Sequence, residues 1–410
     1  MTTAPSRAAL ASELRERVVR SVDEQADRVI ALSHAIHANP ELGYAEHAAA
    51  ALVGRAMSDA GFATEVGAFA VPTAVEAVTG NGELTVAVCG EYDALPDVGH
   101  ACGHNLIAAM GVGAAVALGE VADELGLRVK LLGTPAEEHG GGKVDLLLAG
   151  AWEDVTFSLM AHGGTGADAP ADAMRSTAVE RLEVIYTGRA AHAAGAPEKG
   201  INAGAAATVA LTALGLLRQQ LGPGVNVNAY VSHGGEATNI IPERSVVALE
   251  IRAYDLDDWR DVRRRVLACF EAGAVATGCS WEHRRTEHPY APLAPHGGLA
   301  ETWNRVFRGL GRVLDPDRIL GGGSTDMGNV SQVLPAIHPL VSVGAAEAIP
   351  HNAEFTAVAA SPEADAAILD GAKALALTVV EVALDESLRT ELLALQQARP
   401  AGATRTTLEG

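Results

Sequence analysis

A cysteine and a histidine that could share a metal ion stand two residues apart in the stretch Gly99-His-Ala-Cys-Gly-His-Asn105. Thiolate and imidazole are both good ligands for divalent transition metals. Gly103, between Cys102 and His104, lets the backbone bend so that both side chains face one point. Two close ligands arise easily by chance, however, and a metal site needs three or four. The remaining ligands must therefore come from other parts of the chain.

The composition restricts the classes of protein that this chain can represent. Its 410 residues suggest two or three domains. Hydrophobic residues make up 48% and aromatic residues only 4%, with 44 glycines, which suits an α/β protein better than a β-sandwich. The formal charge of -21 keeps the chain in solution and opposes binding to nucleic acids and to membranes. Four irregularly spaced cysteines and the lack of an apolar signal segment predict a cytoplasmic protein.

Polar side chains follow each of four predicted strands. Apolar runs at 84–89, 128–132, 155–160 and 337–343, separated by turn signals and helices, predict buried strands of a mainly parallel sheet. The residues that follow these strands, in chain order, are Glu91, Asp93, Cys102 and His104, then Glu137 and Glu138, then His162, and finally His351. Ligands of open α/β sheets bind beyond the carboxyl ends of the strands, so we expect these side chains at one rim.

A second pattern interrupts this sheet between residues 175 and 288. Strands predicted at 181–187, 225–232, 245–254 and 279–287 alternate with helices at 201–221 and 257–273 in the order βαββαβ, which is the ferredoxin-like arrangement. Sheet-like strands resume after it. The pattern therefore predicts an inserted domain, 175–288, inside a catalytic domain made of residues 8–174 and 289–395, which opens with helices at 8–38 and 44–60.

The rim residues suggest metal-assisted hydrolysis. Sulfur, nitrogen and oxygen ligands are offered by Cys102, His104, Glu138, His162 and His351. Five ligands exceed one tetrahedral site but suit two adjacent ions that share a ligand. The neighbouring Glu137 cannot easily bind the same ion as Glu138 and would be free to act as a general base. Imidazole and thiolate favour zinc, while carboxylates tolerate manganese, so the pattern leaves both metals open.

Each of these residues also has an ordinary structural interpretation. A Glu-Glu pair after a strand is typical of a solvated loop, and an isolated Cys102 is typical of a small buried apolar side chain. His351 could belong to a surface loop, and His338 is interpreted as an ordinary surface or packing histidine. The spacing alone does not decide between these interpretations.

Several motifs taken together resemble a known enzyme family. They are the stretch at 99–105, Asn-Pro-Glu-Leu-Gly at 39–43, Thr-Pro-Ala-Glu-Glu-His-Gly-Gly-Gly at 134–142, Met-Ala-His-Gly-Gly at 160–164, Gly-Arg-Ala-Ala-His-Ala-Ala at 188–194, and the late His351. In this order they resemble the amidohydrolase branch of the dinuclear-metal aminoacylase and carboxypeptidase family. The resemblance spans roughly residues 30 to 360.

This resemblance implies a role for each candidate ligand. Cys102 would bridge two divalent ions, with His104 and His162 completing one site and Glu138 and His351 the other. Glu137 would activate water and later protonate the leaving amine.

The resemblance also implies a homodimer. The inserted domain looks like the family's dimerisation and lid domain, from which His192 would reach the partner's site and help stabilise the tetrahedral oxyanion. Asn239 would help to bind the substrate. A small amide or dipeptide is the expected substrate.

Two departures from the family pattern narrow the subgroup. Asn105 stands where many members have Asp, and Ser324-Thr325-Asp326-Met327-Gly328 stands where many have Glu-Asp-Phe. Both changes resemble aminobenzoyl-glutamate hydrolase and the dipeptidase that cleaves β-alanyl-lysine-type peptides. The alternatives are an aminoacylase or carboxypeptidase with another side-chain preference, and a catalytically silent metal-binding homologue.

Three further residues complete the set of predicted site residues. Asp93 is expected to orient a ligand histidine, although a turn-forming role is the alternative. Arg252 could bind a substrate carboxylate, but a structural ion pair is an equal alternative. Thr325 is predicted as a further substrate contact.

Overall fold

The computed structural model describes residues 7–319, 321–345 and 347–408, which form two compact units. Of the described residues, the larger unit takes those that fall within 1–175, 293–321 and 325–410. The smaller unit consists of Ser176–Pro292 and the short segment Gly322–Ser324.

The larger unit is built on a six-stranded sheet with the strand order β1-β2-β4-β3-β5-β11. Its strands are β1 (Ala63–Val66), β2 (Val75–Thr79), β3 (Leu84–Gly90), β4 (Leu127–Gly133), β5 (Phe157–Leu159) and β11 (Ala336–Ile337). β3 pairs in parallel with β4 and β5, and β5 pairs in parallel with β11. β1 and β2 add antiparallel pairs at one edge. The predicted mainly parallel sheet is confirmed.

Two predicted elements of this unit are wrong in their extent. The strand expected over 337–343 is two strands, because β12 (Leu340–Ser342) leaves the main sheet and pairs in parallel with β6 (His162–Gly164). Pro339 lies between β11 and β12 and has no N–H to donate to a ladder, so the chain changes partners there. The helix expected over 8–38 is divided at Gln25, whose side chain bonds to the carbonyl of Gly113 (3.1 Å).

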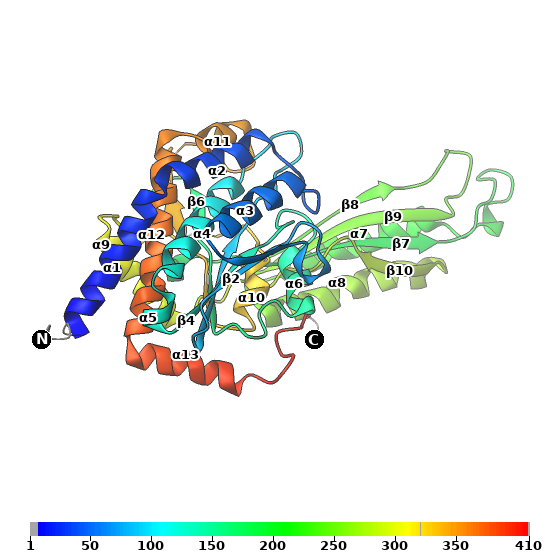
Figure 1. The fold of residues 1–410 in the computed structure, drawn as a ribbon. Helices are drawn as coiled ribbons and strands as arrows, with labels where there is room; N and C mark the ends of the chain where they lie inside the picture. Colours follow the sequence, from blue (N-terminus) through cyan, green and yellow to red (C-terminus); the bar gives the residue numbers. More distant parts are fainter. Residues whose placement is uncertain (1–6, 320, 346, 409–410) are drawn as a thin grey trace, which may run out of the picture. The chain divides into compact units, whose positions relative to one another are not determined.

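Helices cover both faces of the sheet (Figure 1). They are α1 (Arg7–Glu24), α2 (Ala26–Ala38), α3 (His47–Asp59), α4 (His104–Gly119), α5 (Ala122–Leu125), α6 (Gly142–Ala149), α9 (Gly297–Gly309), α10 (Met327–Ser331), α11 (Ala353–Val358), α12 (Pro362–Leu384) and α13 (Glu386–Ala398), with the short 3-10 turns η1 (Ala68–Ala70) and η2 (Ala171–Ala173). α4 packs on β3 and β4, and α1 and α12 pack on α4. Within the described ranges, no helix combines the length and the apolar character needed to cross a membrane.

Alternating side chains of β3 enter two different apolar cores. Val86 and Val88 join the core that contains α4 and α12, whereas Ala87 and Cys89 join a second core that contains Trp152. Both faces of the strand are buried, as expected for a central parallel strand, and period-two alternation distributes its side chains between them. This packing fixes the carboxyl end of β3, from which the site begins.

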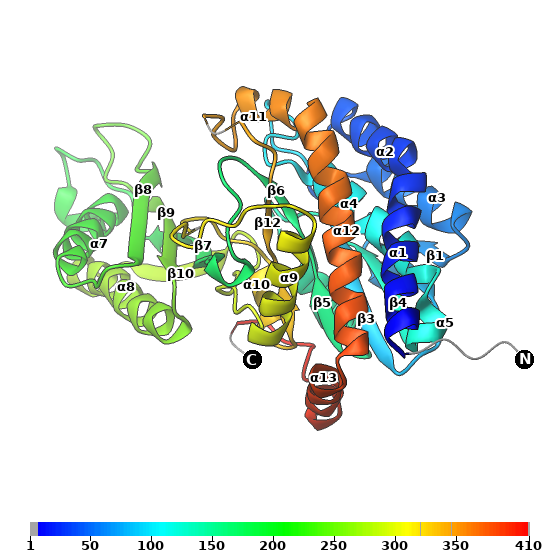
Figure 2. The same cartoon turned by 90° about the vertical axis from the view of Figure 1, so that its left-hand side faces the viewer.

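The smaller unit is a four-stranded antiparallel sheet with two helices on one face (Figure 2). Its elements in chain order are β7 (Ala178–Thr187), the turn η3 (Pro197–Lys199), α7 (Ala203–Arg218), β8 (Val225–His233), β9 (Arg244–Ala253), α8 (Leu256–Thr277) and β10 (Ser280–Arg285). The strand order β10-β7-β9-β8 and the packing of α7 and α8 on each other confirm the predicted βαββαβ arrangement. β8 and β10 are the edge strands of this sheet.

Candidate metal centre and active site

Two groups of potential metal ligands share a single cysteine at the carboxyl ends of the central strands. Cys102, His104 and His162 form one group, and Cys102, Glu138 and His351 form the other. Within each group the ligand atoms all lie within 4.8 Å of one another. The structure thus brings together the five side chains that the sequence singles out, in two groups that have the Cys102 thiol in common.

The loop before α4 presents Cys102 and His104 through the predicted glycine bend. Gly103 adopts a left-handed conformation (φ 79°) at the start of α4, which favours glycine. An added Cβ there would lie 3.1 Å from the ring of Phe355, so the packing also leaves little room for a side chain. The backbone N–H of His351 donates to the carbonyl of Ala101 (2.8 Å), which ties the late ligand to this loop.

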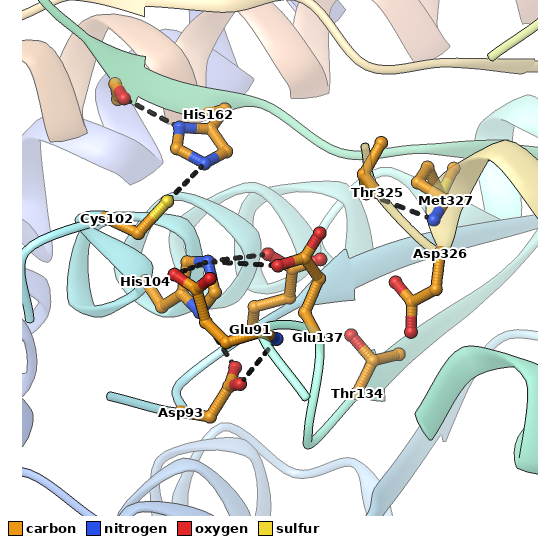
Figure 3. Close-up of polar contacts among 12 residues, drawn as sticks. Glu91, Asp93, Cys102, His104, Thr134, Glu137, His162, Thr325, Asp326 and Met327 are labelled. Carbon is orange, nitrogen blue, oxygen red and sulfur yellow. Dashed lines mark hydrogen bonds and ion pairs between the residues drawn. The ribbon is translucent and has the colours of Figure 1, made fainter. Parts of the chain in front are cut away.

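Asp93 fixes the orientation of His104. The ring nitrogen Nδ1 lies 2.7 Å from Asp93 Oδ1, so Nδ1 carries a proton and Nε2 is the atom left to bind a second proton or a metal (Figure 3). Nε2 lies 3.4 Å from Glu91 Oε2, 3.8 Å from Glu137 Oε2 and 3.9 Å from Glu138 Oε1. Although burial opposes the charged ring, Asp93 and Glu91 raise the pKa of His104 well above its usual value. A proton or a metal cation is therefore strongly favoured at Nε2.

His162 shows the same type of orientation. Its Nδ1 lies 2.6 Å from the carbonyl oxygen of Gly163, and its Nε2 lies 3.5 Å from Cys102 Sγ (Figure 3). Burial and the neighbouring His104 lower the pKa of His162 to about 4, which keeps the ring neutral. A neutral imidazole whose Nδ1 is occupied offers Nε2 to a metal.

Three buried atoms of the site without a hydrogen-bond partner fit the binding of a cation. Among the described residues, Glu91 Oε2, His104 Nε2 and Glu138 Oε1 are buried and have no hydrogen-bond partner. Buried polar atoms in folded proteins are nearly always paired, so three such atoms around one point call for a ligand. Burial and the Glu138 carboxylate also hold the pKa of Cys102 above its usual value, and a bound cation would reverse that shift.

Glu137 lies beside this ligand set in a buried position. Its side chain is 9% exposed. Burial, followed by the carboxylates of Glu91 and Glu138, holds the pKa of Glu137 well above its usual range. A carboxyl group that binds a proton this readily suits general acid–base chemistry near neutral pH.

A buried lysine that sequence reasoning missed holds two acidic side chains near the ligands. Lys143 is fully buried; its Nζ lies 2.7 Å from Asp326 Oδ1 and in close contact with Glu91. Its backbone N–H donates to Asp326 Oδ2 (2.8 Å). The sequence places Lys143 in a Gly-Gly-Gly-Lys segment with no spacing that marks a buried ion pair, so the pattern gave no signal.

His338 fits the packing alternative of its two predicted environments and not the surface one. It is 1% exposed, and its ring lies 5.6 Å from the ring of His162. Both of its ring nitrogens lack a hydrogen-bond partner among the described residues. Burial and His162 hold the pKa of His338 well below its usual value, so the ring is neutral.

In the smaller unit, His192 and Asn239 lie on neighbouring loop segments. His192 is exposed, and its Nδ1 accepts hydrogen bonds from the N–H groups of Ala194 (3.2 Å) and Gly195 (2.9 Å). An accepting Nδ1 leaves the ring proton on Nε2, so neutral His192 is a hydrogen-bond donor through Nε2. The N–H of Ala193 donates to the carbonyl of the exposed Asn239 (2.9 Å).

Arg252 and Thr325 have structural partners. Arg252 Nε lies 2.7 Å from Glu250 Oε1, and its Nη1 lies 3.0 Å from Ser324 Oγ, all within the smaller unit. In the larger unit, Thr325 is 5% exposed and its hydroxyl accepts from the N–H of Met327 (3.1 Å). These contacts favour the structural alternative for Arg252.

Comparison with known proteins identifies relatives over nearly the whole chain. A family model described as a peptidase dimerisation domain matches residues 180–277. The Xaa-Arg dipeptidase of Mus musculus is 39% identical over 400 residues, covering 92% of this chain and 92% of that protein. A p-aminobenzoyl-glutamate hydrolase polypeptide of Escherichia coli is 28% identical over 295 residues, covering 66% of this chain and 60% of that protein.

Solved structures share the fold. The aminobenzoyl-glutamate utilization protein of Klebsiella pneumoniae superposes with a TM-score of 0.69 at 20% identity, covering 89% of this chain and 98% of that one. A dinuclear metal-binding M20 peptidase of Bacillus subtilis superposes with a TM-score of 0.63 at 20% identity, covering 88% and 99%. At these identities the likeness concerns the fold alone.

Proposed function

This chain belongs to the dinuclear-metal aminoacylase and carboxypeptidase family of metallopeptidases (M20), and from that premise we propose that it hydrolyses dipeptides with a basic C-terminal residue. It is a metal-dependent hydrolase of small amide or peptide substrates. The observation that carries the proposal is the pair of ligand groups sharing Cys102, with Glu137 beside them. The 39% identity to an Xaa-Arg dipeptidase supports the basic residue.

The two ions would be held by the five ligands that the sequence predicts. Cys102 is shared, His104 and His162 complete one position, and Glu138 and His351 complete the other. Zinc and manganese both suit this mixture of sulfur, nitrogen and oxygen. When bound, the ions supply Lewis acidity and lower the pKa of a coordinated water.

Glu137 is the proposed general base and acid. Its carboxylate takes a proton from the attacking water as the new C–O bond forms, and returns that proton to the amide nitrogen as the C–N bond breaks. The burial of Glu137 and its raised pKa support both halves of this transfer. Asp93 keeps His104 in the tautomer that leaves Nε2 available.

The carbonyl oxygen becomes an oxyanion when water attacks the carbonyl carbon and needs a hydrogen-bond donor, and we assign this role to His192 of the partner subunit in a homodimer. A neutral His192 that donates through Nε2 and is exposed on its own subunit supports this assignment. The match of residues 180–277 to a dimerisation domain supports the dimer. Asn239, on the neighbouring segment, is the proposed substrate contact. Arg252 and Thr325 are proposed as further substrate contacts, and each also has a structural partner.

The proposed domain division places the metal ligands and Glu137 in one domain and His192 in the other. Residues 8–174 and 289–395 form the catalytic domain, and 175–288 form the dimerisation and lid domain. We place the enzyme in the cytoplasm, because a shared Cys102 ligand has to stay reduced and the cysteines of the described chain are free.

The substrate preference is tested on three amides with different leaving groups. Purified enzyme is assayed on a dipeptide with C-terminal arginine, on β-alanyl-lysine and on p-aminobenzoyl-glutamate, with metal content measured by elemental analysis. We expect two metals per chain and preferred cleavage of the two dipeptides. Preferred cleavage of p-aminobenzoyl-glutamate would move the function to the hydrolase relatives instead.

Two neighbouring variants separate the base from the ligand. Glu137→Ala is expected to retain both metals and to lose activity by about 10²–10⁴-fold. Glu138→Ala is its matched control, because it removes an adjacent carboxylate of the same type but is expected to lose metal. Retention of activity in Glu137→Ala would exclude Glu137 as the base.

A further inference from the structure

Two buried carboxylates hold the backbone on both sides of Glu137. The N–H of Ala136, the preceding residue, donates to Glu46 Oε1 (2.8 Å). The N–H of Glu138, the following residue, donates to Asp93 Oδ2 (2.9 Å). Asp93 already has a role in orienting His104, whereas Glu46 has none in the site as described so far.

The backbone that Glu46 holds is in an unfavourable conformation. Ala136 has a φ of 57°, in the left-handed region that residues with a Cβ seldom adopt. The carbonyl of Ala136 accepts from the N–H groups of Gly141 (3.0 Å) and Gly142 (3.3 Å), so the peptide groups on both sides of this residue are hydrogen-bonded. Such a conformation is stable only where several surrounding contacts enforce it, and it is commonly found at functional sites.

Because another residue caps helix α3, the carboxylate of Glu46 is available to bind the N–H of Ala136. Glu46 stands at the start of α3, where a side chain often caps the helix, but its side chain makes no cap hydrogen bond. Glu41 takes that role: its Oε2 accepts from the N–H groups of Ala48 and Ala49, both at 2.9 Å. The acidic residue of the 39–43 motif thus stabilises the helix, and Glu46 turns to the loop of Glu137.

The carboxyl group of Glu46 is buried, so it needs hydrogen bonds to compensate for the loss of water. It is 0% exposed, and its second oxygen, Oε2, has no hydrogen-bond partner among the described residues. Removing a carboxyl group from water is unfavourable unless it makes good hydrogen bonds. The bond to Ala136 is the contact that links this buried group to the catalytic loop.

We propose that Glu46 is a positioning residue that fixes the direction of Glu137 by holding Ala136, through its N–H, in the left-handed conformation. This inference rests on the proposed role of Glu137 as the base. It assigns to the N-terminal segment a function in catalysis that is separate from metal binding.

The decisive pair of variants is Glu46→Leu and Glu46→Gln. Leucine has a similar volume but no acceptor, whereas glutamine retains a carbonyl oxygen for the N–H of Ala136. We expect Glu46→Leu to lower kcat at least tenfold, with KM changed less than twofold and two metals per chain retained. Glu46→Gln should keep kcat within about twofold of the wild type, which a merely volume-dependent role does not predict.

Hydrogen exchange in the metal-stripped protein gives a readout that does not depend on activity. The amide of Ala136 should exchange at least tenfold faster in Glu46→Leu than in the wild type, and at a near wild-type rate in Glu46→Gln. Glu41→Leu is the matched control: it removes a carboxylate from the same motif, so it should lower stability at α3 without changing kcat or the exchange of Ala136.

The outcomes separate this inference from the proposed function. An inactive wild type with both metals bound would contradict the hydrolase substrates proposed above, while the exchange experiment would still test Glu46. Unchanged kcat and exchange in Glu46→Leu, or loss of metal in parallel with activity, would overturn the positioning role. If Glu46→Leu does not fold, Glu46→Ala is judged by the same criteria.

Discussion

The site residues of the larger unit are buried or partly buried, with the exposed His351 as the exception, whereas His192 and Asn239 of the smaller unit are exposed. His104 is 0% exposed and bonded to Asp93, eleven residues earlier in the chain. His192 is exposed, and its ring accepts from N–H groups two and three residues later.

This difference separates two requirements of the reaction. Metal ligands and a base need fixed directions and little water, which burial and hydrogen bonds from other segments provide. An exposed histidine held by a local turn is accessible to a second molecule but is not enclosed by its own surroundings. We infer that the larger unit carries a prearranged centre, and that His192 acts only after a partner subunit or substrate covers it.

Removal of Cys102 is expected to have the largest effect, because it belongs to both ligand groups. Cys102→Ala should lose both metals and lower kcat by at least about 10³-fold, since metal assistance contributes several kcal/mol to the barrier. Cys89→Ala is the matched control, as Cys89 is another free cysteine of the larger unit but lies in the apolar core, away from both ligand groups. Elemental analysis that finds two metals in Cys102→Ala would contradict the shared-ligand arrangement.

His192→Ala tests the exposed side of the comparison. We expect kcat to fall by about 10²–10³-fold, the usual effect of removing an oxyanion donor, with metal content and thermal stability unchanged. An exposed side chain contributes little to the core, so a loss of stability would point to a structural role instead.

Mixing two inactive variants tells whether His192 acts across subunits. In a mixed dimer of Glu137→Ala and His192→Ala chains, one site would combine an intact Glu137 with an intact His192 from the other chain. Activity should therefore reappear after the subunits exchange. The mixed dimer should reach at most half of the activity of the wild-type dimer, because only one of its two sites is complete. If His192 serves its own subunit, both sites stay inactive and no activity returns.

The sequence predicts the buried centre well where chemistry and position coincide. The carboxyl ends of parallel strands lie at one edge of the sheet, so side chains that follow those ends converge. The residues that follow strand ends are Cys102, His104, Glu138, His162 and His351. The glycine bend at Gly103 was predictable for the same kind of reason, because the spacing of two ligands required it.

The supporting contacts could not be predicted in this way. Lys143 and Glu46 act through segments that meet only in the folded chain, and a single sequence contains no signal of such long-range pairs. The division of 337–343 into β11 and β12 depends on Pro339, whose effect could have been read from the sequence. The burial of His338 could not, because an isolated histidine carries no mark of its surroundings.

Asp93→Asn tests how far metal binding depends on the hydrogen bonds that orient the buried ligands. Loss of the charged acceptor at Nδ1 of His104 should weaken metal binding by about 10–100-fold, as is usual for such outer contacts. Competition with a chelator measures this change, and excess metal should restore most of the activity. An unchanged metal affinity would mean that Asp93 serves only to hold the backbone N–H of Glu138.

Glu46→Gln has the smallest expected effect on catalysis but a measurable effect on stability. Burial, followed by Asp93, raises the pKa of Glu46 from 4.5 to about 7. The native state therefore holds this proton up to a higher pH than the unfolded state, so the wild type loses stability as pH rises from 4.5 to about 7. Below this window neither state is ionised, and above it the full loss is present.

Glutamine does not ionise and so lacks this pH-dependent loss. In metal-stripped protein, the free energy of unfolding of Glu46→Gln relative to the wild type should increase by about 2–3 kcal/mol between pH 4.5 and pH 7.5. Urea titrations at fixed protein concentration measure it, and Glu46→Leu should show the same slope from a lower starting value. If the difference in free energy of unfolding between Glu46→Gln and the wild type does not change with pH, Glu46 is exposed to water. The loop that carries Glu137 would then not belong to the buried, prearranged part of the site.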